Sequence, residues 1–497
     1  MPESNTAPES TVSESTAASP TTASEDVFDV IVIGAGPVGE NVADRARAAG
    51  LTVALIESEL VGGECSYWAC MPSKALLRPV AALAEARAVA GSREAVTGKL
   101  DAAAVFARRD EFTSHWKDDG QAGWVDSIGA VLVRGHGRLA GPRRVEVDTP
   151  DGGVRRLAAR HAVAVCTGSD ALIPDLPGVA QAKPWTSRQA TSGRDVERLV
   201  IVGGGVVGVE MATAWRALGA EVTLLIREAA PLPRMEPFVG EMIASSLSEA
   251  GVKVRTGVTV TGLDRPTQGG PVSVLLADGQ KIEGDEVLLA VGRTPRTKHL
   301  GLETVGLETG SWLKVDDSCR VQGVDGDWLF AVGDVNHRAL LTHQGKYQAR
   351  IAGTVIGALA RGEALDMQRW SPHVATADID AVPQVVFTEP EVGSVGKTAD
   401  EARRAGLNVR VVDYDLGQVA GASLFADGYR GRARMVVDLD RNVLLGVTFI
   451  GSGVAELVHS ATVAVAGEVP IDRLWHAVPS YPTISEVWLR LLETLRG

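Results

Sequence analysis

Cys65 and Cys70 are the side chains of this sequence best suited to chemistry. They stand five residues apart in the segment GGECSYWACMPSK, whereas the two remaining cysteines, Cys166 and Cys319, are isolated in expected strands. A close pair in a chain with only four cysteines indicates redox chemistry or a metal site rather than the framework of a secreted protein. A metal site would need further Cys or His ligands, and none lies within a dozen residues of the pair. On a regular helix this spacing gives a rise of about 7.5 Å, so the segment must bend if the two cysteines bond.

A glycine-rich turn of the dinucleotide-binding type stands before this pair. Its glycines are Gly34, Gly36 and Gly39, between an apolar segment and an expected helix. The first glycine of such a turn forms a tight bend, the second lets the backbone approach a pyrophosphate, and the third lets the helix pack against the strand. Glu57 ends the next apolar segment, where a carboxylate can accept hydrogen bonds from ribose hydroxyls. The pattern recurs 169 residues later with Gly203, Gly205 and Gly208.

The second turn has no carboxylate at the position that corresponds to Glu57. Ile226 stands there, and Arg227 follows it. A guanidinium binds a ribose 2′-phosphate through bidentate, charge-assisted hydrogen bonds, whereas a carboxylate would repel it, so the sequence favours NADPH over NADH. Glu228 beside Arg227 keeps NADH possible, and Arg234 is a candidate second phosphate contact.

The elements that must position these residues follow from the hydrophobic pattern. Residues 27–57 and 198–228 each have the pattern of strand, glycine turn, helix and strand, which predicts two nucleotide-binding βαβ units. Helices are expected over 75–90 and 102–112, and a hairpin is expected to turn at Asp278 and Gly279. From about residue 382, alternating strands around helices carry no nucleotide motif. A chain of 497 residues therefore holds about three domains.

The composition describes a globular protein that binds neither nucleic acid nor membrane. The residues are 45% hydrophobic, and the formal net charge of −13 disfavours contact with phosphate backbones or anionic lipid. No segment approaches the roughly 18 to 20 apolar residues of a membrane span. Residues 1–26, rich in Ser, Thr and Glu, lack the features of a signal peptide. We expect that segment to be a disordered tail and the protein to be cytoplasmic.

The order and spacing of the motifs resemble those of the class I pyridine nucleotide-disulfide oxidoreductases, which include lipoamide dehydrogenase, glutathione reductase and mercuric reductase. The shared motifs are GAGPVG, GG-x-C-x4-C-x-PSK, CTGSD, GGGVVGVE, LLAVGRTP, LFAVGDV and PQVVFTEPEVGSVG, and they span nearly everything after the tail. The resemblance implies an α/β fold with two Rossmann-like dinucleotide-binding domains, for FAD and NAD(P), and a C-terminal α+β dimerisation domain. It implies an FAD-binding domain over 27–165 and 301–375, an NAD(P)-binding domain over 166–300, and a dimerisation domain over 380–497.

The resemblance also implies roles for individual residues. Cys65 and Cys70 would form a redox-active disulfide, with Cys70 as the thiolate beside the flavin and Cys65 as the thiol that attacks the substrate. Lys74 would lie beside the flavin and pair with Glu210. Val206 stands where the family often has an aromatic gate for the nicotinamide. The implied positions for FAD are Gly34, Gly36, Gly39, Glu57, Lys74, Gly137, Gly168, Asp334, Thr342 and His343, and those for NADP are Gly203, Gly205, Gly208, Arg227 and Gly292.

The C-terminal segment SYPTISE departs from the family's pattern. Many members have His-Pro-Thr with a Glu five places after the His; here Tyr481 replaces the His and Glu486 keeps its place. A phenol with a pKa of about 10 donates a hydrogen bond but shuttles protons poorly at neutral pH, so reduction of ordinary disulfides should suffer. Mercuric reductase has a tyrosine at the corresponding place, although this chain has no additional cysteine pair to deliver a metal. His476 is a candidate substitute acid, and Tyr481 before Pro482 favours a cis peptide.

The leading hypothesis is an FAD-dependent oxidoreductase that passes electrons from NADPH, with NADH possible, through FAD and the disulfide to a small disulfide, a metal ion or another electrophilic acceptor. One alternative is an NAD-linked dihydrolipoamide dehydrogenase, against which Arg227 and Tyr481 both argue. Another is a flavin diaphorase or quinone reductase with idle cysteines, while a non-enzymatic flavoprotein would retain these residues without use. We expect a homodimer with active sites shared across the interface, a small-molecule acceptor and no bound metal. The expected catalytic residues are Cys65, Cys70, Lys74, Glu210, Tyr481 and Glu486.

Overall fold

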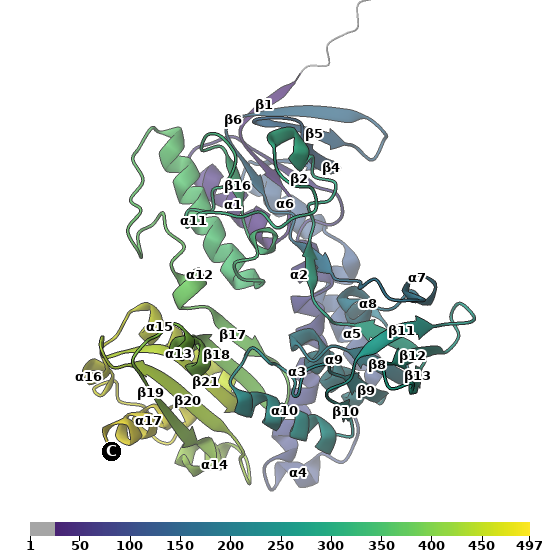
Figure 1. Ribbon diagram of the computed structural model, residues 1–497, viewed down its shortest axis with the longest axis vertical. Coiled ribbons are helices and arrows are strands. Elements are labelled where there is room, and N and C mark those ends of the chain that lie inside the picture. Colours follow the sequence, from purple (N-terminus) through teal and green to yellow (C-terminus); the bar gives the residue numbers. More distant parts are fainter. Residues whose placement is uncertain (1–24) are drawn as a thin grey trace, which may run out of the picture.

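The computed structural model describes residues 25–497 (Figure 1). Of the segment expected to be a tail, residues 1–24 lie outside the described part, and Asp26 is already the first residue of β1. Figure 1 shows one sheet at the top, a second at the lower right and a third at the lower left, with α3 running between the lower two. No helix within the described residues is long and apolar enough to cross a membrane.

The first sheet joins segments that are far apart in the chain. Five strands run parallel, in the order β3-β2-β1-β6 with β16 beside β6, and the antiparallel strands β5 and β4 extend the sheet. Residues 30–33 of β1 are all buried because helices α1 and α11 cover one face, while the β4–β5 hairpin and later loops cover the other. The bounds are β1 Asp26–Ile33, β2 Val53–Glu57, β3 Val131–Arg134, β4 His136–Leu139, β5 Arg144–Asp148, β6 Val154–Val165, β16 Leu329–Ala331, α1 Pro37–Ala48 and α11 Thr342–Ala360.

The second sheet repeats the same unit with four parallel strands in the order β10-β9-β8-β14. A three-stranded antiparallel sheet of β11, β12 and β13 packs beside it, and the hairpin predicted at Asp278 and Gly279 is confirmed between β12 and β13. Two short strands, β7 and β15, pair where the chain passes between the first and second sheets. The bounds are β7 Ser169–Ala171, α7 Val179–Ala182, α8 Ser187–Ser192, β8 Arg198–Val202, α9 Val206–Ala217, β9 Glu221–Leu225, α10 Pro237–Glu249, β10 Lys253–Arg255, β11 Val260–Asp264, β12 Val272–Leu276, β13 Lys281–Gly284, β14 Glu286–Leu289 and β15 Arg293–Pro295.

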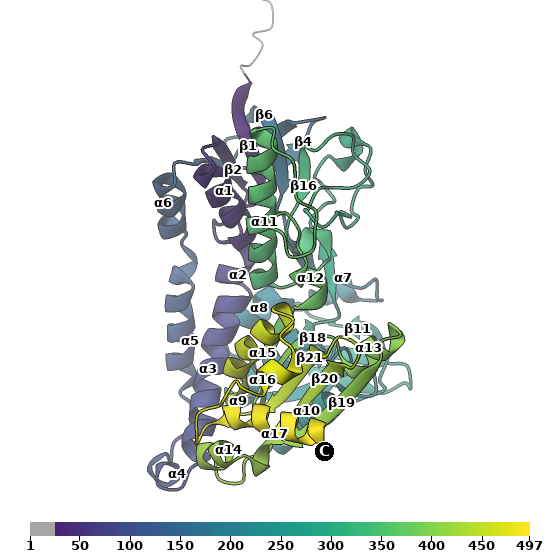
Figure 2. The same cartoon turned by 90° about the vertical axis from the view of Figure 1, so that its left-hand side faces the viewer.

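Helices between the first two units form one side of the molecule. Figure 2 shows α3 and α5 side by side, with α4 at their far end, which confirms the helices expected over 75–90 and 102–112. α3 packs against α9 of the second unit, so its beginning lies where the three main parts of the molecule meet (Figure 1). The bounds are α2 Gly63–Tyr67, α3 Cys70–Arg87, α4 Ser92–Ala95, α5 Ala102–Phe112 and α6 Asp119–Ser127.

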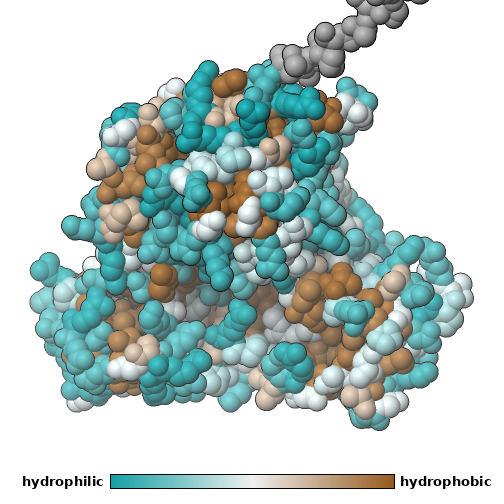
Figure 3. All heavy atoms as spheres, turned by 45° about the horizontal axis from the view of Figure 1, so that its top comes forward, coloured by the Kyte–Doolittle hydropathy of each residue, from teal (hydrophilic) through white to brown (hydrophobic). Residues whose placement is uncertain are grey.

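The C-terminal region is a five-stranded antiparallel sheet, β17-β18-β21-β20-β19, with helices around it. Every residue of β21 is buried, yet large apolar side chains remain exposed outside the sheet, among them Leu424, Val463 and Val478. On the face in Figure 3, apolar residues gather in separate patches between polar ones. The bounds are α12 Ala377–Asp380, β17 Pro383–Val386, β18 Glu391–Gly396, α13 Ala399–Arg404, β19 Val409–Asp415, α14 Ala420–Phe425, β20 Arg432–Asp438, β21 Val443–Gly451, α15 Leu457–Ala466, α16 Ile471–Leu474 and α17 Val487–Arg496.

These sheets confirm the predicted α/β fold class, with two Rossmann-like units and a C-terminal α+β region. One local expectation was wrong. Neither isolated cysteine lies in a strand: Cys166 is the first residue after β6, and Cys319 lies in a turn with φ +67°. Both thiols are buried, and burial raises the pKa of each well above that of an ordinary thiol.

Candidate active site

The segment that carries Cys65 and Cys70 is bent, as a bond between them requires. α2 ends at Tyr67 and α3 begins at Cys70, and the two residues between them leave the helical backbone region. Both cysteines are free thiols in this structure, which corresponds to the reduced form of the pair. The Cys70 Sγ lies 3.3 Å from the Oγ1 of Thr342, the first residue of α11.

The surroundings of the two thiols differ, and so do their pKa values. The hydrogen bond from Cys65 lowers the pKa of Cys70, and the Thr342 hydroxyl and the positive charge of Lys74 act in the same direction. The pKa of Cys65 is raised because its proton is held in that bond and its thiol is buried. Cys70 is therefore the thiol that ionises first, which agrees with the thiolate role that the resemblance implies.

Lys74 and Glu210 form the ion pair that the sequence predicts. Lys74 Nζ donates to Glu210 Oε2 at 2.7 Å, and the side chain of Glu210 is only 4% exposed. The other carboxylate oxygen accepts the backbone amide of Phe387 at 3.0 Å, and Lys74 Nζ lies 4.9 Å from the centre of the Phe387 ring. Lys74, Glu210 and Phe387 come from α3, α9 and the loop after β17. The pair therefore connects α3, which begins at Cys70, to the second βαβ unit and to the C-terminal sheet.

The first glycine turn has the geometry that a pyrophosphate needs. Gly34 has φ +100°, and a Cβ there would lie 2.5 Å from the carbonyl oxygen of Cys166. A Cβ on Gly39 would lie 1.8 Å from the carbonyl oxygen of Gly34, so only glycine lets α1 pack this closely on the strand. Above Gly36, in contrast, the nearest atom to a Cβ would be 4.0 Å away, on Gly63. The open position is the one at which the backbone must approach a ligand.

Polar groups gather at the carboxyl ends of the parallel strands beside this turn, where open α/β sheets bind their ligands. Glu57 is buried and accepts the backbone amides of Ala35 at 2.8 Å and Glu59 at 2.7 Å. Glu40 Oε1 and Thr167 Oγ1 are buried and have no hydrogen-bond partner among residues 25–497. Burial also raises the pKa of Glu40 to about 7. A bound polar ligand would supply the partners that these two oxygens lack.

The second glycine turn repeats the first. Gly203 has φ +115° with a Cβ position 2.3 Å from the carbonyl oxygen of Ala290, and a Cβ on Gly208 would lie 1.9 Å from the carbonyl oxygen of Gly203. A Cβ on Gly205 would meet no atom within 4 Å. Two glycine turns of the same backbone geometry are therefore present, and each has room for a dinucleotide at its middle glycine.

The comparison with known families decides the assignment. Residues 28–353 match the family described as pyridine nucleotide-disulphide oxidoreductase, and residues 382–491 match the dimerisation domain of that family. The chain belongs to this family. It is accordingly an oxidoreductase whose family uses FAD and a pyridine nucleotide, and the two turns with their open middle glycines fit these two cofactors.

Relatives within the pyridine nucleotide-disulphide oxidoreductase family match over almost the whole chain. A dihydrolipoyl dehydrogenase of Thermus scotoductus is 31% identical over 474 residues, which cover 94% of this chain and 97% of the relative. A leghemoglobin reductase of Glycine max is 30% identical, with 93% of this chain and 86% of the relative covered. Among solved structures, LpdA of Mycobacterium tuberculosis has a TM-score of 0.79 at 25% identity, covering 94% of this chain and 100% of its own. The Cu(II) complex of RclA, an HOCl-induced flavoprotein disulfide reductase of Escherichia coli, has the same fold, with a TM-score of 0.79 at 22% identity and 94% and 99% covered.

Four further positions that the family resemblance assigns to FAD lie near the first sheet in different settings. Asp334 accepts the Ser169 hydroxyl at 2.6 Å, and Gly168, directly before Ser169, has φ +72° and open space around it. His343 Nε2 lies 2.8 Å from the carbonyl oxygen of Pro383, so it faces the start of β17. A Cβ on Gly137 would press on the Ile33 and Ile56 side chains, which makes close packing a sufficient reason for that glycine.

The positions assigned to NADP include one that is already paired. The side chain of Arg227 is 80% exposed and bonds the neighbouring Glu228 at 2.8 Å. Ile226 is fully buried against Gly204, and Arg234 is exposed. Gly292 has φ +148°, and its carbonyl accepts the amide of Leu172. Arg227 is thus free to reorient toward a phosphate at the cost of one surface ion pair.

The two C-terminal candidates for proton transfer, Tyr481 and His476, lie on the surface of a single subunit. The Tyr481 side chain is 78% exposed, and His476 is also exposed. The predicted cis peptide between Tyr481 and Pro482 is confirmed. Glu486 is instead buried, and its carboxylate accepts the amides of Thr483 at 3.1 Å and Gly421 at 3.3 Å. Within one chain Glu486 fixes the loop that presents Tyr481 to solvent.

The sequence analysis missed several residues that touch the candidate site. Glu40 follows the third glycine, and Thr167 follows β6, but nothing in their spacing marks them as buried acceptors. Arg188 and Thr191 of α8 contact the bend between the cysteines and were equally unpredicted. The one local signal for that bend is Pro72, because a proline interrupts the helix that precedes it.

Proposed function

We propose that this enzyme reduces a small electrophilic acceptor, a disulfide or a metal ion, with electrons that come from NADPH through FAD and the Cys65–Cys70 pair. The observation that carries the proposal is the arrangement of the pair: two thiols in mutual contact, with the Thr342 hydroxyl and the Lys74–Glu210 ion pair beside Cys70. When bound, FAD supplies the ring through which two electrons from the nicotinamide reach the pair. The first glycine turn and Glu57 would hold it, and the residues over 27–165 and 301–375 would form its domain.

For a disulfide acceptor, the residues of this chain account for the chemistry. The Cys65 thiol gives up its proton as its sulfur attacks one sulfur of the acceptor, the acceptor's S–S bond breaks, and the other sulfur leaves and takes up that proton. The Cys70 thiolate then attacks Cys65, which forms the Cys65–Cys70 disulfide and releases the second sulfur, and that sulfur takes a proton from solvent to become a thiol. Two electrons and two protons are transferred in all. The lowered pKa of Cys70 keeps it ionised for the second step.

Which acceptor the enzyme prefers depends on the residues that the second subunit of the dimer brings to the cysteine pair. The match to a dimerisation domain indicates a homodimer, and we propose that the exposed Tyr481 of each subunit faces the cysteine pair of the other. A phenol cannot take up and return protons at neutral pH as a histidine does, so acceptors that need no proton from the protein, such as a metal ion, would be favoured over ordinary disulfides. We also propose a cytoplasmic location, because a reducing compartment preserves free thiols between turnovers.

A second candidate function rests on the names of the relatives, several of which are dihydrolipoyl dehydrogenases. An NAD-linked dihydrolipoamide dehydrogenase would use the same cysteine pair. Arg227 in the second unit and Tyr481 in place of the histidine argue against this function.

The test is an anaerobic titration of the FAD-loaded enzyme with NADPH and with NADH, in which the long-wavelength absorption band of a thiolate beside the flavin is followed. We expect the band with NADPH, and we expect Cys70→Ser to abolish both the band and turnover. A panel of lipoamide, glutathione disulfide, mercuric and cupric ions and quinones then ranks the acceptors. If Cys70→Ser reduces quinones unimpaired and no band appears in the unmodified enzyme, the cysteines are idle and the enzyme is a flavin diaphorase.

A further inference from the structure

The bend between Cys65 and Cys70 has a cause in the sequence. Pro72 stands four residues after Trp68, and a proline lacks the amide hydrogen that would bond the carbonyl four residues earlier, and its ring clashes with that carbonyl. Pro72 therefore removes one helical hydrogen bond and disfavours a continuous helix through both residues. The break falls at Trp68 and Ala69, which have φ −136° and φ −129°. The carbonyl groups at the end of α2 are left without helical amides.

Side chains from two other elements take the place of those amides. Trp116 Nε1 donates to the carbonyl oxygen of Tyr67 at 3.1 Å. Thr191 Oγ1 donates to the carbonyl oxygen of Trp68 at 2.9 Å. The Thr191 hydroxyl also lies 3.1 Å from two carbonyl oxygens of its own helix, but helical amides already serve carbonyls inside α8. The Trp68 carbonyl has proline where its amide would be, so it depends on Thr191.

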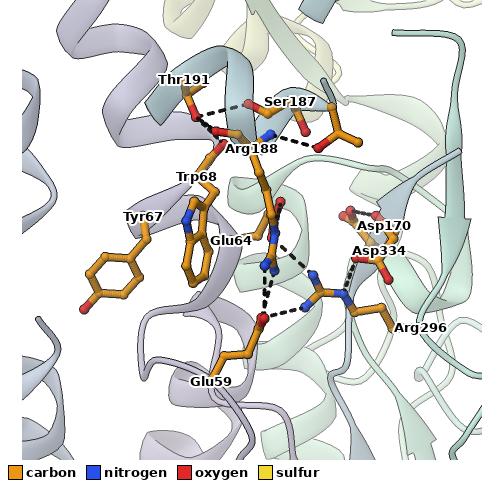
Figure 4. Close-up of polar contacts among 12 residues, drawn as sticks. Glu59, Glu64, Tyr67, Trp68, Asp170, Ser187, Arg188, Thr191, Arg296 and Asp334 are labelled. Carbon is orange, nitrogen blue, oxygen red and sulfur yellow. Dashed lines mark hydrogen bonds and ion pairs between the residues drawn. The ribbon is translucent and has the colours of Figure 1, made fainter. Parts of the chain in front are cut away.

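Arg188, on the same face of α8 as Thr191, holds the two ends of the bend together (Figure 4). Its guanidinium lies 4.2 Å from the centre of the Trp68 ring, a cation–π contact. Its Nε donates to Glu64 at 2.8 Å, and its other nitrogens bond Glu59 at 2.8 and 3.0 Å. Arg296 adds a second cation 3.3 Å from Glu64. Arg188 and Glu64 are largely shielded from solvent, with 24% and 19% of their side chains exposed, whereas Glu59 is exposed.

The contacts of α8 fall on the residues that flank the thiols. Glu64 directly precedes Cys65, and Trp68 lies between the two cysteines. We propose that Arg188 and Thr191 are positioning residues for the Cys65–Cys70 pair: they hold the bend at the spacing at which the disulfide closes. This inference rests on the proposed redox role of the pair. It assigns to α8, which lies more than a hundred residues further along the chain, the control of how readily the pair is oxidised.

The direction of the effect follows from the geometry of a disulfide. An S–S bond fixes the separation of the two Cβ atoms and restrains the bend by itself. A dithiol whose bend is loose has more conformations than one whose bend is held, so releasing the bend stabilises the dithiol more than the disulfide. The equilibrium to be measured is an exchange in which the two thiols of the pair give two electrons and two protons to a reference disulfide, which becomes a dithiol. Loosening the bend shifts this exchange away from the Cys65–Cys70 disulfide.

The experiment uses the full-length, FAD-loaded enzyme equilibrated anaerobically with mixtures of reduced and oxidised dithiothreitol. Free thiols are then trapped by acid and alkylation and counted by mass spectrometry. Thr191→Val, which has nearly the same shape but no hydroxyl, is expected to lower the equilibrium constant for disulfide formation about tenfold, or about 30 mV. Arg188→Gln is expected to lower it at least as much. Thr191→Ser, which retains the hydroxyl, should stay within about twofold of the unmodified enzyme, the scatter expected when the hydrogen bond is kept.

The matched control is Arg194→Gln. Arg194 also pairs with a carboxylate, Asp110, and lies 5.3 Å from the centre of an aromatic ring, Phe106, but the structure gives it no contact with the bend. Its replacement should leave the equilibrium constant unchanged. FAD content and the melting temperature show whether each variant is folded. If Arg188→Gln loses FAD, the comparison of Thr191→Val with Thr191→Ser decides whether α8 positions the cysteine pair.

The outcomes separate this inference from the proposed function. If the unmodified enzyme forms no Cys65–Cys70 disulfide at any ratio of the buffer, the proposed function is wrong. If it forms the disulfide but folded Thr191→Val and Arg188→Gln have the same equilibrium constant as the unmodified enzyme, α8 does not position the pair and this inference alone is overturned.

Discussion

The two glycine turns of this oxidoreductase have nearly the same backbone but different side chains around it. Gly34 and Gly203 have φ +100° and +115°. Cβ atoms on Gly39 and Gly208 would lie 1.8 and 1.9 Å from the carbonyl oxygens of these first glycines. The shared geometry explains why both turns can receive a pyrophosphate. It contains no information about which dinucleotide each one takes.

The difference lies at two positions after each turn. Glu40 follows the third glycine of the first turn, whereas the buried Val209 follows that of the second. Glu57 ends the second strand of the first unit as a buried acceptor, whereas Ile226 and the exposed Arg227 directly follow that of the second, which ends at Leu225. The first site is therefore built from buried acids and the second from an apolar wall with a cation at its rim. We propose that the glycines admit a dinucleotide and that these side chains select which one binds.

The largest effect should come from adding a methyl group at the third glycine of either turn. In Gly39→Ala the new Cβ meets a backbone carbonyl that no side-chain rotation can relieve, so we expect a loss of about 3 kcal/mol or more in stability, and loss of FAD. Gly208→Ala should damage only the second unit, leaving FAD bound but pyridine nucleotide binding abolished. Chemical unfolding, FAD content and NADPH reduction kinetics measure the three results.

The middle glycines serve as the matched controls for this pair. Gly36→Ala and Gly205→Ala place a Cβ in open space, so both variants should fold with unchanged stability and weaken only the dinucleotide at their own site. Equal destabilisation of Gly36→Ala and Gly39→Ala would show that the space around an added Cβ does not determine the stability of the turn.

A second, smaller effect should appear when the buried acid of the first site is neutralised. Glu57→Gln puts an amide nitrogen against one of two backbone amides and leaves one acceptor fewer for the ribose hydroxyls of FAD, so FAD binding should weaken by about 2 kcal/mol, or about 30-fold. Fluorescence titration of apoprotein with FAD measures the affinity. NADPH binding in the second unit should stay unchanged, and an equal loss at both sites would contradict the separation of the two.

Much of this comparison could be predicted from the sequence, because it depends on local spacing. The glycines, Glu57 and the Lys74–Glu210 pair all stand in motifs whose order fixes their place on strand ends and helix starts. The burial of Glu40 and the contact of Thr191 with Trp68 could not be predicted. Both arise where elements distant in the chain pack together, and the hydrophobic periodicity of a sequence does not predict which side chains make contact there.

The buried Glu40 distinguishes the first turn from the second, and the pH dependence of stability tests whether it is buried. Its pKa in the folded protein, about 7, lies above the usual 4.5, so the folded state without FAD binds this proton more tightly than the unfolded state does. The resulting stability is complete below about pH 4.5 and is lost as pH rises through about 7, with a magnitude on the order of 3 kcal/mol. Melting temperatures of apoprotein between pH 5 and 8 should therefore fall in the unmodified chain and fall less in Glu40→Gln. Identical profiles would mean that Glu40 does not titrate in this range.

The smallest effect is expected at the rim of the second site, where Arg227 is exposed and bonded only to Glu228. Arg227→Gln should raise the KM for NADPH about tenfold and leave that for NADH unchanged, because only the 2′-phosphate loses a charged partner. Lys253→Gln, at an exposed cation in the adjacent strand β10, is the matched control and should alter neither KM. Steady-state kinetics with both nucleotides measure the ratio. A parallel change in both KM values would show that Arg227 does not distinguish NADPH from NADH. It would favour the second candidate function, an NAD-linked dihydrolipoamide dehydrogenase, which rests on the names of the relatives.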